Sequence, residues 1–162
     1  MRALGKTVIG AIVISVLIVF FTKLAGMFPF YLTMITETFN LANIAATDNY
    51  IKEQYYTDSL DGLRSLPLYR ENASSVEIEI LNADGRTAVG DNDEYGYIDA
   101  DPSFKPYLQR GNPVSIRISA VYPFQFELWG RPTAFDVPVS FSLTTVGLRY
   151  YKDLPIDDLY AD

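Results

Sequence analysis

Residues 7–22 read TVIGAIVISVLIVFFT, a run of sixteen residues without a charged side chain. As an α-helix with a rise of ~1.5 Å per residue, this run extends about 24 Å, slightly less than the hydrocarbon core of a bilayer. Lys23 interrupts the run, but residues 24–36 are again uncharged. A lysine stem can lie along an apolar surface while its ammonium group reaches water, so the apolar helix can continue past Lys23. Residues 1–30 therefore predict a transmembrane or filament-core helix.

The charges of the chain are divided unequally around this run. Residues 1–40 contain three basic and one acidic side chain, a net charge of +2, whereas residues 41–162 contain ten basic and nineteen acidic side chains, a net charge of −9. Arg2 and Lys6 precede the apolar run, which places the N-terminus in the cytoplasm by the positive-inside rule and the acidic body outside. The net charge of −7 for the whole chain argues against a nucleic-acid partner.

The composition excludes several classes of function. The chain has no cysteine and no histidine, which removes disulfide scaffolds, thiol catalysis, thiolate metal sites, the commonest general base and the commonest zinc ligand. Nucleophile elbows, Walker loops and glycine-rich dinucleotide turns are also missing from the sequence. With 49% hydrophobic residues the chain can form a packed core. We therefore expect a structural protein, with neither enzymatic activity nor a cofactor.

A cleaved signal peptide is the alternative interpretation of the basic and apolar N-terminus. The apolar run is longer than a usual signal-peptide core, and it continues into a helical pattern instead of a small-residue cleavage site. A retained helix is therefore favoured. Pro29 lacks a backbone N–H, so we expect a kink or a melted turn near Gly26–Pro29.

Residues 31–66 have the pattern of an amphipathic continuation of this helix. Apolar residues recur there at spacings of three and four, as on one face of a helix, at Leu32, Ile35, Phe39, Ala42, Ala46 and Tyr50. The stripe resumes at Tyr56, Leu60 and Leu63. Gly62 and Pro67 supply stop signals. The sequence therefore predicts one very long helix that ends before Pro67.

After Pro67 the period of the apolar residues changes to two, which indicates β-strands. Alternating runs begin near residues 76, 113, 124 and 137, and an Asp-Gly pair within residues 82–86 predicts a hairpin turn. Inward-facing positions are expected at Val76, Ile78, Ile80, Val114, Ile116, Ile118, Val139, Phe141 and Leu143. The predicted fold class is α+β, with the long helix packed on a small antiparallel sheet, and residues 67–162 form an extracellular β-rich body.

One loop weakly matches a calcium-binding pattern. In DNDEYGYIDAD, residues 91–101, the side chains of Asp91, Asp93 and Asp99 occupy positions 1, 3 and 9 of an EF-hand loop. Tyr95 stands where a ligand is expected, and Pro102 takes the place of the bidentate glutamate. A solvated acidic loop is therefore the stronger interpretation.

The layout of the chain resembles that of a type IV pilin, in which a long N-terminal helix, apolar in its first half, packs on a small antiparallel sheet. More closely, NLANIAATDNYIKEQYYTDSLDGLRSL at residues 40–66 and SFSLTTVGLRYYKDL at residues 140–154 are similar to the TadE-like pilin family. The resemblance implies a subunit that is held in the membrane and then extracted by an assembly machinery into an extracellular filament. Its partners would be other copies of the same chain, in a helical homopolymer whose core is formed by bundled N-terminal helices.

Several residues of the apolar helix are expected to form the assembly interface. These are Val8, Ile12, Val16, Val19, Phe20, Lys23, Pro29 and Glu37. Type IV pilins usually carry a glutamate at the fifth mature position, but this chain has Gly5 followed by Lys6. The ion pair that such a glutamate makes with a neighbour's terminal amine is therefore missing if Met1 is the mature terminus.

Lys23 is expected to need a partner if the helices form a bundle, because a buried ammonium is costly. The carbonyl oxygens around Ala25 and Gly26, or Glu37 of a neighbouring copy, could supply one. Alternatively, Lys23 reaches a solvent layer beneath the bodies. The second functional hypothesis for the whole chain is a single-span membrane-anchored protein, either a minor pilin or a ligand-binding ectodomain, that does not form the filament itself.

Overall fold

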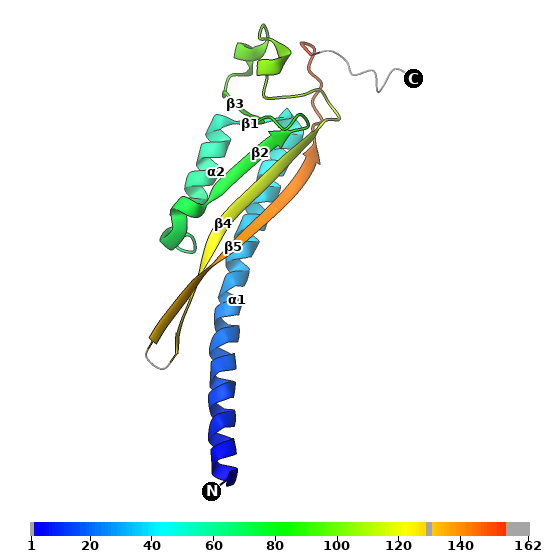
Figure 1. Ribbon diagram of the computed structural model, residues 1–162. Coiled ribbons are helices and arrows are strands. Elements are labelled where there is room, and N and C mark those ends of the chain that lie inside the picture. Colours follow the sequence, from blue (N-terminus) through cyan, green and yellow to red (C-terminus); the bar gives the residue numbers. More distant parts are fainter. Residues whose placement is uncertain (1, 129–130, 155–162) are drawn as a thin grey trace.

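The structure, a computed structural model, describes residues 2–128 and 131–154. It has the predicted α+β architecture, a long N-terminal helix packed on a small antiparallel sheet (Figure 1). The elements in chain order are α1 (Arg2–Asp48), β1 (Ile51–Lys52), α2 (Glu53–Ser65), the 3₁₀ helix η1 (Arg70–Ser75), β2 (Glu77–Asn82), β3 (Val89–Gly90), the 3₁₀ helices η2 (Glu94–Tyr97) and η3 (Pro102–Phe104), β4 (Pro113–Leu128) and β5 (Arg131–Val146).

Helix α1 is unbroken over 47 residues, so the melted turn expected near Gly26–Pro29 is wrong. At ~1.5 Å per residue its length is about 70 Å. Pro29 removes one backbone donor, but α1 continues through it. Side chains of the body contact the helix both before and after Pro29. The hydroxyl of Tyr69 donates to the carbonyl oxygen of Phe30 at 2.6 Å, and the hydroxyl of Tyr122 donates to that of Lys23 at 3.4 Å.

The prediction of one continuous helix through residues 31–66 is also wrong, because the chain reverses after Asp48. Asn49 adopts a left-handed conformation with φ of 59°, which ends α1, and α2 then runs back beside the sheet (Figure 1). The side chain of Asn49 donates to the carbonyl oxygens of Leu108 and Arg149 and accepts from the backbone N–H of Arg149. Asparagine tolerates this conformation better than most residues, and these long-range bonds stabilise it.

The main sheet is antiparallel, with strand order β2-β4-β5, and a separate two-stranded parallel sheet joins β1 to β3. β4 and β5 pair along their full length, from Pro113 with Val146 to Leu128 with Arg131. The strands expected on either side of Pro123 are therefore one strand. Pro123 lies beyond the end of β2. The N–H of Val121, two residues earlier, points away from β5 and donates to Ser75. The backbone nitrogen of Pro123 faces the same way, so its missing N–H costs no ladder hydrogen bond. The turn predicted at residues 82–86 is confirmed by hydrogen bonds between Asn82 and both Gly85 and Arg86.

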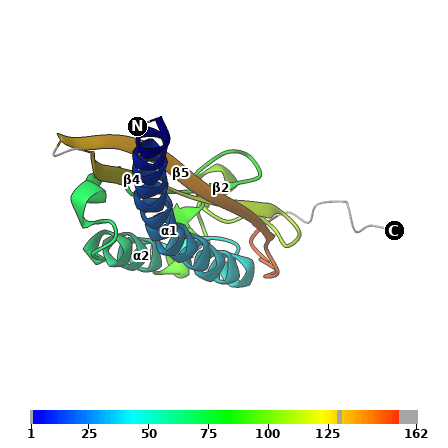
Figure 2. The same ribbon diagram turned by 90° about the horizontal axis from the view of Figure 1, so that it is seen from below.

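The core lies between α1 and the sheet, and α1 crosses the sheet face as Figure 2 shows from below. The inward positions predicted on β2 and β4 are confirmed, since Ile78, Ile80, Val114, Ile116 and Ile118 are all buried. The buried face of α1 differs in part from the predicted stripe and consists of Phe30, Met34, Thr38, Leu41, Ala42 and Ala45. Leu32 and Phe39 are instead exposed, because this half of α1 has apolar residues on more than one side.

The chain segment after β5, residues 147–154, forms a strap across the end of α1. Its backbone is held by Ala46 and by the side chains of Asn49 and Gln109. The strap also carries Tyr151 and Leu154, which pack with Tyr50 and Tyr107 in a second hydrophobic cluster. Burial raises the pKa of Tyr50 to about 12, with further contributions from the carboxylates of Glu94 and Asp48.

Candidate functional site

The lower half of α1, residues 6–28, is almost entirely exposed. An 18-residue window of this helix has a mean hydropathy of 2.5 and contains no buried residue. The exposed apolar side chains in this half are Val8, Ile9, Ile12, Val13, Ile14, Leu17, Ile18, Val19, Phe20, Phe21, Leu24 and Phe28. Among the described residues, one helix, α1, is therefore long and apolar enough to cross a membrane.

A long hairpin accompanies this half of the helix. We call residues 121–128 of β4 and 131–137 of β5 the hairpin arm; it extends past β2 towards the N-terminus of α1 (Figure 1). Phe124 of the arm is buried, and its ring centroid lies 5.7 Å from that of Phe20 on α1. Tyr122, Phe126 and Phe135 surround Phe124 and complete an aromatic face. The arm is therefore held on α1 near Phe20 and Lys23.

Towards its tip the arm diverges from α1 (Figures 1 and 2). A groove is lined by residues 8–19 of α1 and by Glu127 of the arm. We call this the helix–arm groove; its volume is about 410 Å³. It is lined by Val8, Ala11, Ile12, Ser15, Val16, Val19 and Glu127. One wall is thus an apolar face of α1, and Glu127 of the arm borders the groove on the other side.

The structure brings most of the predicted interface residues together on this face. Val8, Ile12, Val16 and Val19 line the groove, and Phe20 packs on Phe124 of the arm. Sequence reasoning did not identify Glu127 or the arm's aromatic face. The signal for the aromatic face was present, because the period-two alternation of β4 continues past Pro123 through Phe124 and Phe126. The same alternation places the Glu127 side chain on the opposite face of the arm.

The other three predicted interface residues lie outside the groove. The side chains of Lys23 and Pro29 are exposed, and Glu37 accepts a hydrogen bond from the Asn40 side chain at 3.2 Å. Glu37 lies fourteen residues beyond Lys23 on the same helix, or about 21 Å, so the two cannot pair within one copy. Across the described residues, neither side chain forms an ion pair within 4.0 Å.

The acidic loop does not form the calcium site considered from the sequence. Asp91, Asp93 and Asp99 are all described, and they do not form a group of carboxylates that could hold a metal ion. Asp93 instead accepts a hydrogen bond from the backbone N–H of Tyr95 and caps the 3₁₀ helix η2. The neighbouring Glu94 pairs with Arg149 of the strap at 2.5 Å. Short-range capping and contact with the strap therefore explain the acidic residues at Asp93 and Glu94.

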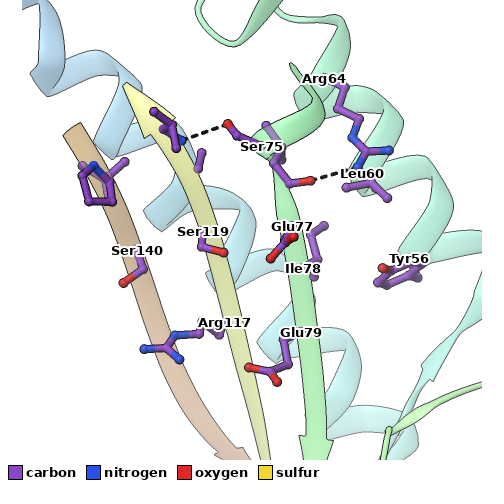
Figure 3. A pocket seen from close by; sticks show the side chains of 15 residues that line it. Tyr56, Leu60, Arg64, Ser75, Glu77, Ile78, Glu79, Arg117, Ser119 and Ser140 are labelled. Atoms are coloured by element: carbon purple, nitrogen blue, oxygen red, sulfur yellow. Dashed lines mark hydrogen bonds between the residues drawn. The ribbon is translucent and has the colours of Figure 1, made fainter. Parts of the chain in front are cut away.

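A larger open groove, of about 970 Å³, lies between α2 and the outer face of the sheet (Figure 3). Arg64 of α2 donates to the carbonyl oxygen of Val76, and the Ser75 hydroxyl accepts from the backbone N–H of Val121. Glu79 and Arg117 are cross-strand neighbours on its floor. The polar groups of this groove are spread along the strands, an arrangement that suits surface contact.

Comparisons of the chain with protein-family models, with curated proteins and with solved structures found no match. What the chain does therefore has to be inferred from its own surfaces.

Proposed function

We propose that the chain is a structural subunit of an extracellular filament of the type IV pilus kind, a homopolymer assembled through the lower half of α1. The observation that carries the proposal is the exposed apolar surface of residues 6–28. Monomeric soluble proteins rarely expose a contiguous apolar patch larger than a few hundred Å². Such a helix requires either lipid or other copies of itself around it. In this proposal the chain has no catalytic role and binds no cofactor.

The position of the hairpin arm supports a filament over a permanent membrane anchor. If residues 7–22 lay in hydrocarbon with the arm in place, the end of the arm would also lie in hydrocarbon, since Glu127 of the arm lines the same groove as residues 8–19 of α1. The arm carries the charges of Glu127 and Arg131, and a two-stranded ribbon has two unpaired edges. A bilayer core tolerates neither unpaired backbone groups nor unpaired charges. The docked arm therefore suits a helix that has left the membrane.

Before assembly, the proposed location is the inner or cytoplasmic membrane. Arg2 and Lys6 would keep the N-terminus on the cytoplasmic side, and the acidic body would lie outside. Extraction by a pilus assembly machinery would then transfer the helix from lipid into the filament core, where the arm can dock.

The second candidate is a single-span membrane-anchored protein, either a minor pilin or a ligand-binding ectodomain. The open groove beside α2 favours it, because a ligand could contact Glu79, Arg117 and Arg64 there. Electron microscopy and immunoblotting of material sheared from the cell surface distinguish the two candidates. The filament proposal expects this chain in the sheared filaments, whereas the anchor would leave it entirely in the membrane fraction.

The substitution Val16→Asp tests the proposal directly. Val16 lies in the helix–arm groove, far from the core of the body, so we expect a folded chain that no longer forms filaments. A carboxylate buried between apolar helices without a partner costs several kcal/mol. The matched control is Asn43→Asp, which places the same side chain at an exposed position in the upper half of α1, residues 29–48. Normal filaments from Val16→Asp would contradict assembly through this half of the helix.

A further inference from the structure

We infer that two copies of the chain pair in parallel and in register through the face of α1 that points away from the body, and that this pairing takes place in the membrane. The face, which we call the back seam, consists of Ile14, Ile18, Phe21, Ala25, Phe28, Leu32, Ile35 and Phe39. The inference goes beyond the proposed filament, because the contact forms before assembly and does not require it.

The back seam has the residue spacing of a coiled coil. Its members follow one another at alternating intervals of four and three residues, the repeat with which two α-helices wind around each other. All of its side chains are apolar, and Asn43 is the next residue on the same face. The repeat therefore runs without interruption from the lower half of α1 into the upper half.

The body leaves the back seam largely uncovered. At ~3.6 residues per turn, the seam lies on the side of α1 opposite to Phe30, which is buried against the sheet. Phe28 is 68% exposed, and Leu32 and Phe39 are each 48% exposed. The ring centroid of Phe39 lies 6.3 Å from that of Phe141 on β5, so the body covers one side of this residue and leaves the other free.

The hairpin arm also leaves the back seam free. Ile12 in the helix–arm groove lies about five turns below Phe30 on the same side of α1. Phe20, which packs on the arm, is not a member of the seam. A contact through the back seam can therefore form whether or not the arm is docked.

Lipid alone cannot cover the whole back seam. From Ile14 to Phe39 it extends about 38 Å at ~1.5 Å per residue, whereas the hydrocarbon core of a bilayer is ~30 Å thick. Lys6 marks the cytoplasmic boundary of the apolar run, so the helix leaves the hydrocarbon about twenty residues later, near Met27. Leu32 lies about 8 Å and Phe39 about 18 Å beyond that point. The same seam on a second copy supplies an apolar surface of matching length for them.

The membrane sets the geometry of the pair. The positive-inside rule places both N-termini in the cytoplasm, so the two helices are parallel. Copies inserted to the same depth are in register, and each seam residue then meets its counterpart across a two-fold axis. Lys23 and Glu37 occupy the positions of the repeat that are farthest from the partner, so the contact buries no charged side chain.

Cysteine cross-linking of the full chain in lipid vesicles tests the pair. The chain has no native cysteine, so Leu32→Cys introduces a single thiol, and in an in-register pair the two thiols face each other. In vesicles of phosphatidylethanolamine and phosphatidylglycerol, mild oxidation should join most copies of Leu32→Cys, and of Phe28→Cys, into disulfide-linked dimers. The matched control is Glu37→Cys, on the outside of the pair, which should remain mostly monomeric. Equal yields of dimer from Glu37→Cys would overturn the inferred face.

Charge substitution at the same position tests the register without disulfide formation. Leu32 is half-exposed, so Leu32→Glu should leave the fold of the body unchanged, but it places two carboxylates opposite each other in the pair. Energy transfer between labelled copies in the vesicles should show that pairing falls roughly tenfold or more, and that mixing with Leu32→Lys copies restores it. The matched control is Asn40→Glu, at an exposed position outside the seam, which should pair like the parent. Mixed copies that pair as poorly as Leu32→Glu alone would overturn the register.

These outcomes are distinct from those that test the proposed function. A chain that pairs in vesicles but forms no filaments on the cell surface would contradict the filament and leave the back seam intact. A parent chain that forms filaments but stays monomeric in vesicles would overturn the inference and leave the filament intact.

Discussion

The two halves of α1 share one backbone but have opposite environments. In the upper half, Phe30, Met34, Leu41 and Ala45 are fully buried against the sheet. In the lower half, apolar residues of the same kinds are exposed, and the arm covers only the region around Phe20. The body can therefore form its core without the lower half. The apolar surface of the lower half is available for contacts outside the monomer.

The ends of the molecule differ in the same way in their polar interactions. At the upper end, Lys105 is buried, and its ammonium donates to Asp153 Oδ2 at 2.6 Å and to two carbonyl oxygens. At the lower end, the charged groups Lys6, Lys23 and Glu127 are exposed and, as far as the structure describes them, have no ion-pair partner. The charged group at the upper end is paired within one copy, whereas those at the lower end form no ion pair among the described residues.

The largest difference in stability is expected between Met34→Ala and Val13→Ala. Met34 is fully buried, so its truncation should lower the free energy of unfolding by about 2–5 kcal/mol. Val13 is 52% exposed, and its truncation should change that free energy by less than about 0.5 kcal/mol. Denaturant unfolding of the full chain in detergent, followed by tyrosine fluorescence of the body, measures both. Equal losses would show that the lower half contributes to the stability of the body.

The sheet was predictable from the sequence because period-two alternation is a local signal. Val114, Ile116 and Ile118 face the core as their spacing predicts, and the Asp-Gly pair forms its turn at Gly85. The exposed apolar half of α1 was predictable for the same reason, since a run without charges is visible in the residues alone.

The end of α1 and the helix–arm groove were not predictable in this way. The apolar stripe continues past Asn49 to Tyr50 and resumes at Tyr56, so it does not mark the end of the helix. The reversal at Asn49 depends on Leu108 and Arg149, which are distant in sequence. The arm reaches the groove only because β4 continues past Pro123 along α1. Both features are tertiary, so no local pattern encodes them.

A smaller effect, confined to the upper end, is expected for Asp153→Asn. This change removes the carboxylate from the buried Lys105, and we expect a loss of about 3 kcal/mol in the free energy of unfolding. Burial alone would raise the pKa of Asp153, but hydrogen bonds from Lys105 and Tyr107 outweigh it, and the net pKa is lowered.

Acid provides the control for this substitution. Because the pKa of Asp153 is lower in the folded chain, its contribution is complete above the unfolded value of about 4 and is lost as the pH falls through the folded value. The difference in stability between the parent and Asp153→Asn should therefore shrink below about pH 4. A difference that stays constant through this range would contradict a role for the ionised carboxylate.

The smallest effects are expected from two glycine-to-alanine substitutions, one in the strap and one in the lower half of α1. Their effects on stability should have opposite signs. A Cβ at Gly147 of the strap would lie 2.5 Å from Cγ of the Asn49 side chain, which is held by three hydrogen bonds, so Gly147→Ala should cost about 1–3 kcal/mol. A Cβ at Gly10 meets no atom within 4 Å, and Gly10→Ala should stabilise α1 by up to about 1 kcal/mol through helix propensity. Denaturant unfolding of the body measures the effect of Gly147→Ala, and circular dichroism measures the helix content of Gly10→Ala.

The Gly10→Ala variant also refines the contrast between the halves of α1, because its effect in the monomer and its effect in the filament can be measured separately. Gly10 is half-buried beside the groove-lining Val8 and Ala11, although no atom blocks an added methyl group within one copy. If the lower half serves only to span lipid, filaments of the variant should be as heat-resistant as those of the parent. If a second helix packs closely there, the methyl group separates the helices, and the filaments should dissociate at a lower temperature although the monomer is no less stable. A loss of stability in the monomer itself would show that Gly10 already has a contact within its own copy.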